Sequence, residues 1–283
     1  MIAEVLTWYE RSARDFPWRA PDRTPWGVLV CEVMSQQTPA ARIVEPWRRW
    51  TARWPEPAAL AAEAPGEAVR MWGRLGYPRR ALRLHAAAVA VTERHCGQVP
   101  AAVPELRALP GVGDYTAAAT AAFGHGVRVA VLDVNVRRVL ARTAGDADPG
   151  PSAPTRHERE RAQALLPADP ATATRWNAAV MELGALVCTA RRPSCGTCPL
   201  SRRCPGPRPA TGRTTRAQPW HGSDRHVRGL VMALARDAEG AVPTATIDTV
   251  WPDRVQLARC VDGLVTDGLL EPVGGGLRLP AGA

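Results

Sequence analysis

Two acidic residues stand out because their neighbours in the sequence are apolar. Glu32 lies within 26–34, a stretch that is apolar nearly all round and is predicted to form a buried helix. A carboxyl group in such surroundings has a raised pKa and can act as a general acid near neutral pH. Asp133 follows the apolar pair Val131 and Leu132 at the start of an amphipathic segment. Each also has a purely structural interpretation, Glu32 as a salt-bridged core residue and Asp133 as a helix cap.

Four of the seven cysteines are grouped near residue 200, in the pattern C-x6-C-x2-C-x5-C: Cys188, Cys195, Cys198 and Cys204. Thiolates this close in sequence can surround one metal centre. Zinc is one alternative, although zinc ribbons usually pair two C-x2-C knuckles and this segment has one. The residues alone leave zinc and an iron–sulfur centre open. The other cysteines are isolated and are expected to be core thiols: Cys31, Cys96 and Cys260.

A glycine-rich turn at 109–117 separates two predicted helices. Pro110 ends the first helix, because the residue before a proline is pushed out of the helical region. Gly111 and Gly113 can adopt positive φ and bring backbone close to a partner. Asp114 is expected to cap the second helix, whose free N–H groups suit a phosphate. The alternative is a tight turn between helices with no ligand.

Charge and composition point to a polyanionic partner. The 283 residues carry a net charge of +9, all 36 basic residues are arginine, and the chain has no lysine. High genomic G+C content can explain how many arginines the chain has, but not why they are concentrated in parts of the sequence. Without lysine, a Schiff-base mechanism through a side chain is excluded. No run approaches the ~20 apolar residues of a membrane span, and the start lacks a signal-peptide layout, so a cytoplasmic, nucleoid-associated location is expected.

The pattern is helical and punctuated by proline through the first 200 residues, with no period-two strand. Helices are predicted over 25–38, 43–54, 57–62, 67–72, 79–93, 134–144, 155–166 and 174–187. A Pro/Gly/Arg-rich linker follows at 206–222. The tail, 223–283, predicts three helices and a hairpin, the order of a small winged-helix fold. Its third helix has no basic excess, which favours packing or protein contact over groove binding.

Several of these motifs together resemble the base-excision DNA glycosylases. The segment 109–140 resembles their helix-hairpin-helix followed by a loop and an aspartate, and the cysteine spacing resembles the [4Fe-4S] loop of endonuclease III and MutY. Residues 1–205 are most similar to the MutY family of adenine DNA glycosylases. The matching motifs are Trp18-Arg19, Glu32-Val33-Met34-x-Gln36-Gln37-Thr38, Leu75-Gly76-Tyr77, Gly111-Val112-Gly113-x-Tyr115-Thr116, Leu132-Asp133-x-Asn135-Val136 and Met181 to Cys188.

The resemblance implies a mainly α, two-domain glycosylase fold. A six-helix domain with the helix-hairpin-helix would span 23–128, and an iron–sulfur domain would combine 1–22 with 129–205. The linker and the winged-helix-like domain would complete the chain. The four grouped cysteines would hold a [4Fe-4S] cluster, and backbone carbonyls of the hairpin can hold a monovalent cation in this family.

The resemblance also assigns roles. Glu32 would protonate adenine N7, and Asp133 would face C1′ of the sugar as electrostatic partner or transient nucleophile, a division of labour known from glycoside hydrolysis. Tyr115 and Asn135 would orient Asp133 and the water. The adenine must leave the duplex to reach these groups, and Trp18, Arg19 and Glu182 would line its pocket. Gln37 and Tyr77 would fill the gap and face the opposite base. Gly111 and Gly113 would contact phosphate.

These roles describe a monomeric, monofunctional glycosylase that removes adenine opposite 8-oxoguanine or guanine in double-stranded DNA. Endonuclease III-like enzymes carry a lyase lysine where Tyr115 stands. Ser35 and Pro78 depart from the family pattern, and the tail is too short for the family's MutT-like domain. The alternatives are a thymine or damaged-pyrimidine mismatch glycosylase, against which Glu32 argues, and an iron–sulfur DNA-binding regulator.

Overall fold

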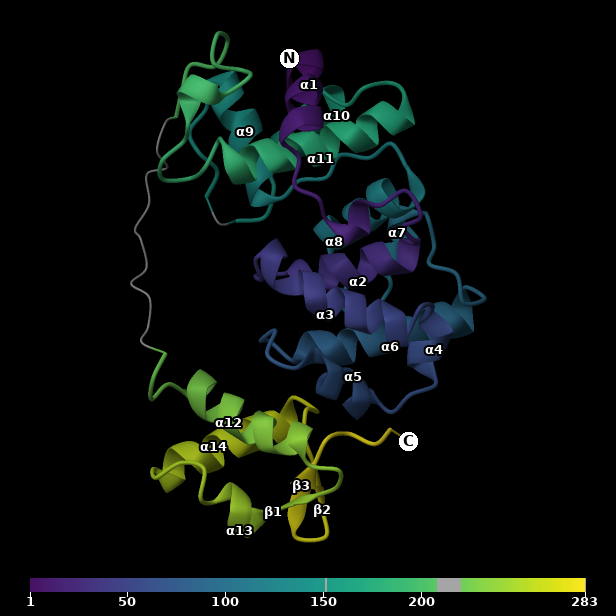
Figure 1. Cartoon of the computed structure of the whole chain (residues 1–283), viewed down its shortest axis with the longest axis vertical. Helices are drawn as coiled ribbons and strands as arrows, with labels where there is room; N and C mark the ends of the chain where they lie inside the picture. The colour runs from purple at the N-terminus through teal and green to yellow at the C-terminus, as the bar shows by residue number, and fades with distance from the viewer. Residues whose placement is uncertain (151, 208–219, 283) are drawn as a thin grey trace. The chain divides into compact units, whose positions relative to one another are not determined.

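Helices make up almost all of the regular structure, as the sequence pattern predicts (Figure 1). The computed structural model describes residues 1–150, 152–207 and 220–282, so most of the predicted linker at 206–222 lies outside the described residues. Among them, strands occur only after residue 241. None of the described helices combines the length and apolar character that a membrane span requires.

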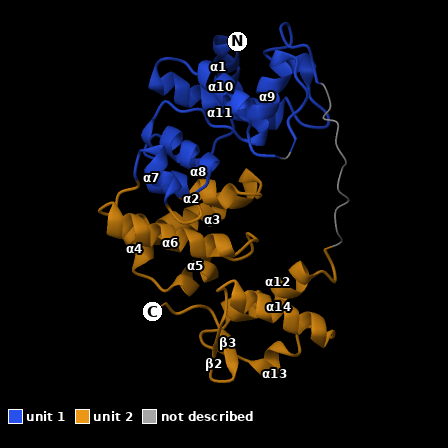
Figure 2. Ribbon diagram, turned by 180° about the vertical axis from the view of Figure 1, so that it is seen from behind, with its two compact units in different colours: residues 1–29, 100–108, 112–214 blue, residues 30–99, 109–111, 215–283 orange. Residues whose placement is uncertain are grey.

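The chain divides into two units (Figure 2). Unit 1 comprises Met1–Leu29, Pro100–Ala108 and Val112–Thr214, and unit 2 comprises Val30–Val99, Leu109–Gly111 and Thr215–Ala283. This division follows packing alone. The domain boundaries expected from the sequence, 23–128 and 1–22 with 129–205, therefore stay a prediction.

Unit 1 owes its helix boundaries to capping side chains. Asp133, Thr155 and Asp169 each accept a hydrogen bond from the backbone N–H three residues ahead, which satisfies a donor that the helix itself leaves free. The unit contains α1 (Ile2–Ser12), the 3-10 turn η1 (Pro17–Arg19), α7 (Val103–Arg107), α8 (Asp114–Ala119), the π-helical turn η2 (Thr120–Gly124), α9 (Val134–Ala144), α10 (Arg156–Ala164), α11 (Pro170–Leu186) and the 3-10 turn η3 (Cys195–Thr197).

Helices α1, α9 and α11 enclose the core of unit 1 (Figure 1). The buried side chains come from the apolar stripes of all three helices, and include Val5, Val139, Trp176 and Leu183. Three of the grouped cysteines also pack against this core: Cys188, Cys198 and Cys204. The cysteine loop is therefore anchored on the same apolar cluster that fixes α9.

In unit 2, tryptophans fill the core beneath the helices. Trp50, Trp54 and Trp72 are at most 1% exposed, and the Trp50 ring meets the other two edge-on at centroid distances of 4.7 and 5.6 Å. Helix α2 (Pro25–Ser35) begins in unit 1 and ends in unit 2. The helices that follow it are α3 (Ala40–Arg53), α4 (Pro57–Ala61), α5 (Pro65–Trp72) and α6 (Arg79–Arg94).

The C-terminal segment has the predicted winged-helix-like order of three helices and a hairpin. Its elements are α12 (Asp224–Asp237), β1 (Val242–Pro243), α13 (Thr244–Ile247), α14 (Arg254–Thr266), β2 (Glu271–Val273) and β3 (Gly276–Arg278). The strands form an antiparallel sheet in the order β1-β3-β2, with Val242 opposite Leu277 and Pro272 opposite Leu277 on the other side. Ser223 and Asp253 cap α12 and α14, which explains where both helices begin.

The C-terminal segment is tied to α5 by backbone contacts. The N–H of Gly66 donates to the carbonyl of Pro280 at 2.8 Å, and a Cβ on Gly66 would lie 2.6 Å from that oxygen. Arg70 donates to the carbonyls of Arg236 and, at 2.9 Å, Ala238 at the end of α12. These contacts make the segment part of unit 2.

One prediction concerns the close approach of α9 and α11. A Cβ on Gly184 would lie 2.7 Å from the Cβ and 2.8 Å from the carbonyl oxygen of Asn135. We expect Gly184→Ala to lower the free energy of unfolding by roughly 1–3 kcal/mol, because the helices must separate. The measurement is the urea midpoint followed by circular dichroism.

Gly229→Ala in α12 is the matched control. No atom lies within 4 Å of a Cβ at Gly229, so the helix gains the ~0.5–1 kcal/mol by which alanine exceeds glycine. Midpoints that move in the same direction for both variants would show that the α9–α11 contact is not tight.

Candidate active site and cluster loop

Asp133 caps α9, and its carboxylate is held from two sides. Oδ1 accepts the backbone N–H of Val136 at 2.6 Å, and Oδ2 accepts the side-chain amide of Asn135 at 2.7 Å. Burial raises the pKa of Asp133 above its ordinary value, although both hydrogen bonds act against the rise. The capping interpretation made from the sequence is confirmed, and the two hydrogen bonds orient a carboxylate that is partly buried.

Asn135 is in turn held by a buried arginine. The Nη2 of Arg138 donates to Oδ1 of Asn135 and to the carbonyl of Gly184, both at 2.7 Å. Its Nε donates at 2.7 Å to the carbonyl of Cys188. Arg138 is 6% exposed. One guanidinium therefore joins the partner of Asp133 to the end of α11 and the first cysteine of the loop.

Tyr115 packs near the segment that leads to Asp133. It packs against a small apolar cluster built from Ala118, Ala122 and Val131, with Met181 also in contact. Val131 stands two residues before Asp133, so the cluster fixes Tyr115 and the chain that leads to α9 against one another.

The glycine-rich turn between α7 and α8 adopts the expected backbone at Gly111 only. Gly111 has φ +78°, and a Cβ there would lie 2.7 Å from Cβ of Arg83, so glycine is required twice over. Gly113 is extended at φ −93°, and it is the N-cap of α8. The predicted cap by Asp114 is wrong: this residue is already inside the helix, one position too late, and forms a 2.7 Å ion pair with Arg107 instead.

Glu182 is buried in α11 between two arginines. It is 1% exposed, and its carboxylate accepts Nε of Arg14 at 2.6 Å and Nη2 of Arg19 at 2.8 Å. Burial would raise the pKa of Glu182, but the hydrogen bonds from the two arginines outweigh it and hold the pKa below 4.5. The rings of Phe16 and Trp18 stack at 4.8 Å, with both guanidiniums about the Phe16 ring.

Glu32 is 8% exposed within the apolar helix α2, which confirms its predicted burial. The helix predicted over 25–38 ends earlier, at Ser35. Thr38 precedes a proline, which disfavours helical backbone there, and Gln37 has φ +57°. Glu32 is therefore one turn from the end of its helix.

Arg80 of α6 holds the end of α2. Its Nη1 donates to the carbonyls of Val33 and Met34 at 3.0 and 2.9 Å and to that of Gln36 at 2.5 Å. Its Nη2 donates to Gly76 O at 3.1 Å. Arg80 is 6% exposed, and burial lowers its pKa to about 10, so it stays charged at neutral pH. It joins the turn after α2 to the turn before α6.

These two turns carry Gln37 and Tyr77. Only three described residues other than glycine have positive φ, and these are two of them, with φ +57° and +49°. Left-handed backbone at such residues costs about 1–3 kcal/mol and persists where the surroundings enforce it. The third is Cys96, which is exposed; Cys31 and Cys260 are buried as predicted, so the expectation of a core thiol is wrong for Cys96.

The four grouped cysteines line one cavity together with Arg142. The 3-10 turn closes the C-x2-C step, because the N–H of Cys198 donates to the carbonyl of Cys195 at 3.2 Å. Arg142, 2% exposed, donates to Sγ of Cys188 at 3.3 Å and pairs with Asp148 at 2.6 Å. Among the described residues no three His, Cys, Asp or Glu side chains converge tightly enough for a single metal ion.

This donor set fits an iron–sulfur cluster. Thiolate is the ligand that such clusters require, the cavity keeps the four sulfurs around one space, and a charge-assisted donor already reaches one of them. Burial raises the pKa of the Cys188 and Cys198 thiols, so iron must displace their protons on binding. The fold and the loop define the class: a helix-hairpin-helix protein with a four-cysteine cluster loop.

Comparison with known proteins identifies the family. The model of the HhH-GPD superfamily of base excision DNA repair proteins matches residues 30–165, and that of the iron–sulfur binding domain of endonuclease III matches 188–204. The adenine DNA glycosylase of Mycobacterium tuberculosis is 47% identical over 98% of this chain and 92% of its own. That of Mycolicibacterium smegmatis is 46% identical over 99% and 95%.

A solved structure also matches. The structure of a thermostable thymine-DNA glycosylase aligns with a TM-score of 0.66 and 27% identity, covering 72% of this chain and 93% of that one. The chain belongs to the adenine DNA glycosylase family within the HhH-GPD superfamily. The cysteine loop binds a [4Fe-4S] cluster, which removes the zinc alternative.

The structure distributes the predicted site residues over both units. Unit 1 holds Trp18, Arg19, Gly113, Tyr115, Asp133, Asn135, Glu182 and the four cysteines, and unit 2 holds Glu32, Gln37, Tyr77 and Gly111. Among these residues, Asn135 donates to Asp133, as predicted, and Arg19 donates to Glu182, a contact that the sequence did not predict.

The sequence reading missed the arginines that hold these residues: Arg14, Arg80, Arg138 and Arg142. Arginine is almost never buried without a partner, so its presence in a sequence gives little reason to expect a core position. The sequence does contain an indication that two of them are buried, because Arg138 and Arg142 lie four residues apart on the apolar side of a predicted helix.

We predict that Arg138→Met lowers the free energy of unfolding by at least about 2 kcal/mol, because Asn135 Oδ1 and two buried carbonyls lose their donor. Arg156→Met is the control, since Arg156 is 92% exposed in its pair with Glu160. Its effect should stay within ~0.5 kcal/mol. Equal urea midpoints for both variants would contradict the role of Arg138.

A second prediction concerns acid stability. The pKa of Glu182 is lowered in the folded state, so its contribution is fully present above 4.5 and is lost as pH falls through the folded-state pKa below that value. Glu182→Gln should therefore destabilise the protein at neutral pH, and the difference from wild type should shrink as the pH is lowered and the wild-type carboxylate becomes protonated. Glu160→Gln, at a side chain 58% exposed, should show neither effect in the same urea titrations.

Proposed function

We propose that this protein is a monofunctional glycosylase of base excision repair that hydrolyses the N-glycosidic bond of adenine opposite 8-oxoguanine or guanine in double-stranded DNA. The observation that carries the proposal is the partly buried Asp133 carboxylate, fixed by Val136 N–H and by Asn135. The identity to adenine DNA glycosylases over nearly the whole chain supports the choice of base.

Asp133 stabilises positive charge at C1′ as the bond to adenine breaks. Its orientation is set before substrate binds, because α9, Asn135 and Arg138 leave its oxygens no other arrangement. Preorganised charge of this kind acts most strongly where water is excluded. Tyr115 and Asn135 orient the carboxylate and the attacking water.

Glu32 protonates N7 of the flipped-out adenine. Its burial in the apolar helix α2 supports this role, because a carboxyl group there is more readily protonated than one in water. One carboxyl then works as an acid and the other as an ionised carboxylate, as in glycoside hydrolysis. The bond between C1′ and adenine N9 breaks, and adenine leaves with its electron pair and the proton from Glu32. Water then adds its hydroxyl to C1′ and gives up a proton that restores the Glu32 acid, so the products are adenine and an abasic site.

Binding of the substrate involves the remaining predicted residues. Glu182, ionised and held by two arginines, offers acceptor lone pairs to the adenine amino group, and Arg19 and Trp18 line that pocket. Gln37 and Tyr77 occupy the gap, and their positive φ supports the role, since strained backbone concentrates at functional sites. The Gly111–Gly113 hairpin contacts phosphate, and its carbonyls hold a monovalent cation.

The [4Fe-4S] cluster fastens the loop 188–204 to the core of unit 1 when bound. The carbonyl of Cys188 accepts a bond from Arg138, so the loop also supports Asn135. No lysine is available for strand cleavage by a Schiff base. The protein acts as a monomer on chromosomal DNA in the cytoplasm.

A thymine mismatch glycosylase is the second candidate, favoured by the structural match to a thymine-DNA glycosylase. The two candidates differ in substrate. Duplexes with A:8-oxoG, A:G and T:G pairs are incubated with the protein and then with alkali. Cleavage of the adenine strand supports the proposal; cleavage of T:G alone, or of none of them, would overturn it.

We predict that Asp133→Asn and Glu32→Gln each slow adenine release in single turnover by at least ~10²-fold, because each removes one half of the acid and carboxylate pair. Glu160→Gln on the surface of α10 should retain the wild-type rate. Full activity of Asp133→Asn would refute the mechanism, whatever the cysteines bind.

A further inference from the structure

An exposed cluster joins the C-terminal segment to the turn before α6. Arg225, in the first turn of α12, donates from Nη2 to the hydroxyl of Tyr77. Its guanidinium carbon lies 4.9 Å from the centre of the Tyr77 ring and 6.0 Å from that of Trp220. Tyr77 and Trp220 are 45% and 55% exposed. We call Tyr77, Trp220 and Arg225 the Tyr77–Arg225 cluster.

The contacts of unit 2 fix this cluster in place. Beside the bonds that Gly66 and Arg70 make to the C-terminal segment, Arg79 of α6 forms an ion pair with Asp267 at 3.2 Å. Asp267 also pairs with Arg228, one turn along α12 from Arg225. Asp267 thus links α12 to the start of α6, next to the turn that carries Tyr77.

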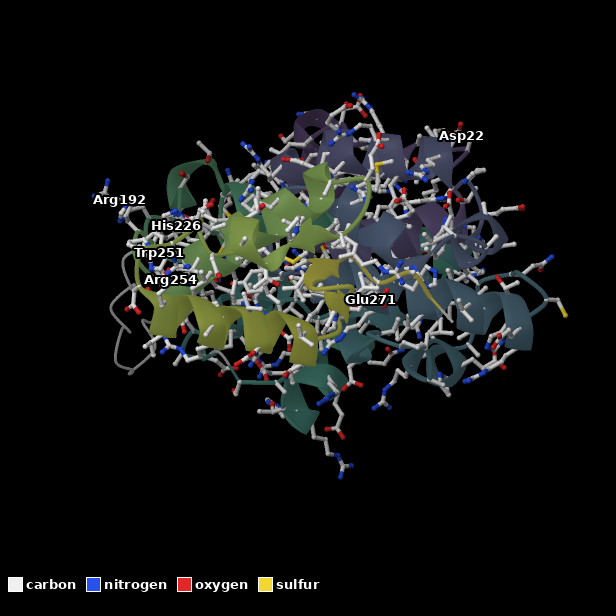
Figure 3. The ribbon with its side chains drawn as sticks, turned by 90° about the horizontal axis from the view of Figure 1, so that it is seen from below. Asp22, Arg192, His226, Trp251, Arg254 and Glu271 are labelled. Atoms are coloured by element: carbon white, nitrogen blue, oxygen red, sulfur yellow. The ribbon has the colours of Figure 1, made fainter. Side chains whose placement is uncertain are left out.

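Aromatic rings support the cluster from the side of the C-terminal segment. The rings of Trp220 and His226 lie 5.8 Å apart, and those of His226 and Trp251 lie 5.4 Å apart. His226 and Trp251 are labelled next to each other in Figure 3. These rings restrict Trp220, and Trp220 and Tyr77 restrict the plane of the Arg225 guanidinium. A planar donor fork held by aromatic rings is suited to a directional contact with paired acceptors.

We propose that Arg225, held against Tyr77, reads the base that stands opposite the excised adenine. The inference rests on the proposed function, in which Tyr77 faces that base. Guanine and 8-oxoguanine present the carbonyl oxygen O6, which a guanidinium recognises, whereas cytosine presents an amino donor at the corresponding edge. The C-terminal segment then supplies part of the specificity for the mispair, where the sequence reading expected only packing or protein contact.

The geometry favours a base over a phosphate as the ligand of Arg225. A phosphate contact needs charge alone, which any exposed arginine supplies. Arg225 instead contacts Tyr77 twice: its guanidinium lies over the ring and donates a hydrogen bond to the hydroxyl. A hydroxyl-bonded, stacked guanidinium is positioned for one partner at one place.

The test measures equilibrium binding to duplexes that carry a tetrahydrofuran abasic site opposite guanine, 8-oxoguanine or cytosine. Such duplexes remove catalysis from the measurement. Wild type should prefer guanine and 8-oxoguanine over cytosine. Arg225→Ala should reduce the preference for guanine over cytosine by roughly 5- to 100-fold, the range for one bidentate arginine–guanine contact, and the preference for 8-oxoguanine by less, because its N7 carries a proton and only O6 accepts. Arg225→Lys should bind all three duplexes with nearly wild-type affinity but lose the preference, because it keeps the charge and loses the fork.

Two further variants complete the design. Arg254→Ala removes a charge of similar exposure from the same segment and should keep the preference, since it does not contact Tyr77. Tyr77→Phe keeps the ring and removes the hydroxyl that Arg225 binds, and its effect should not add to that of Arg225→Ala.

The proposal is overturned if wild type shows no preference, if Arg225→Ala keeps it, or if Arg225→Ala weakens binding to all three duplexes equally, which would indicate a phosphate contact. Adenine release by wild type from A:8-oxoG is measured in parallel. Release with an unchanged preference in Arg225→Ala refutes this inference alone, whereas no release from any duplex refutes the proposed function.

Discussion

An oxygen that folding removes from water must accept a hydrogen bond, and this chain meets that need with buried arginines. Arg138 donates to an amide oxygen and two carbonyls, and Arg142 to a cysteine sulfur and a carboxylate. Arg80 does the same for the carbonyls that end α2. A guanidinium offers five donors in one plane, so a single side chain can fasten three or four segments that sequence separates widely.

This constraint governs the carboxylates as well. Asp133 is partly buried and Glu182 is fully buried, yet the pKa of Asp133 is raised and that of Glu182 is lowered. The difference follows from their partners. Asp133 accepts from a backbone N–H and a neutral amide, which offset burial only in part, whereas Glu182 accepts from two charged arginines, which outweigh it. The same functional group thus serves as a carboxylate with a raised pKa in one place and as a carboxylate with a lowered pKa in the other.

Strain in the backbone is concentrated where arginines can enforce it. Gln37 and Tyr77 have left-handed φ, and Arg80 bonds to the carbonyl beside each of them, those of Gln36 and Gly76. The C-terminal segment adds a second guanidinium at Tyr77. Its attachment through Gly66 and Arg70 makes it a fixed part of unit 2, which is the physical basis for giving it a share in recognition.

Local chemistry in the sequence determined much of this protein. Apolar periodicity and capping residues fixed the helices, so α9 begins after Asp133 and α10 after Thr155, and cysteine spacing indicated the cluster loop. The prediction that Asp114 caps α8 is wrong, because the helix begins at Asp114 itself, one residue earlier than a cap requires, and Asp114 pairs with Arg107 instead. Only the tertiary structure decided which arginines are buried and what they hold, because a long polar side chain looks the same in sequence whether its partners are water or the carbonyls of a distant helix. The contact between Arg225 and Tyr77 is of this kind, since 148 residues separate its partners and no local pattern connects them.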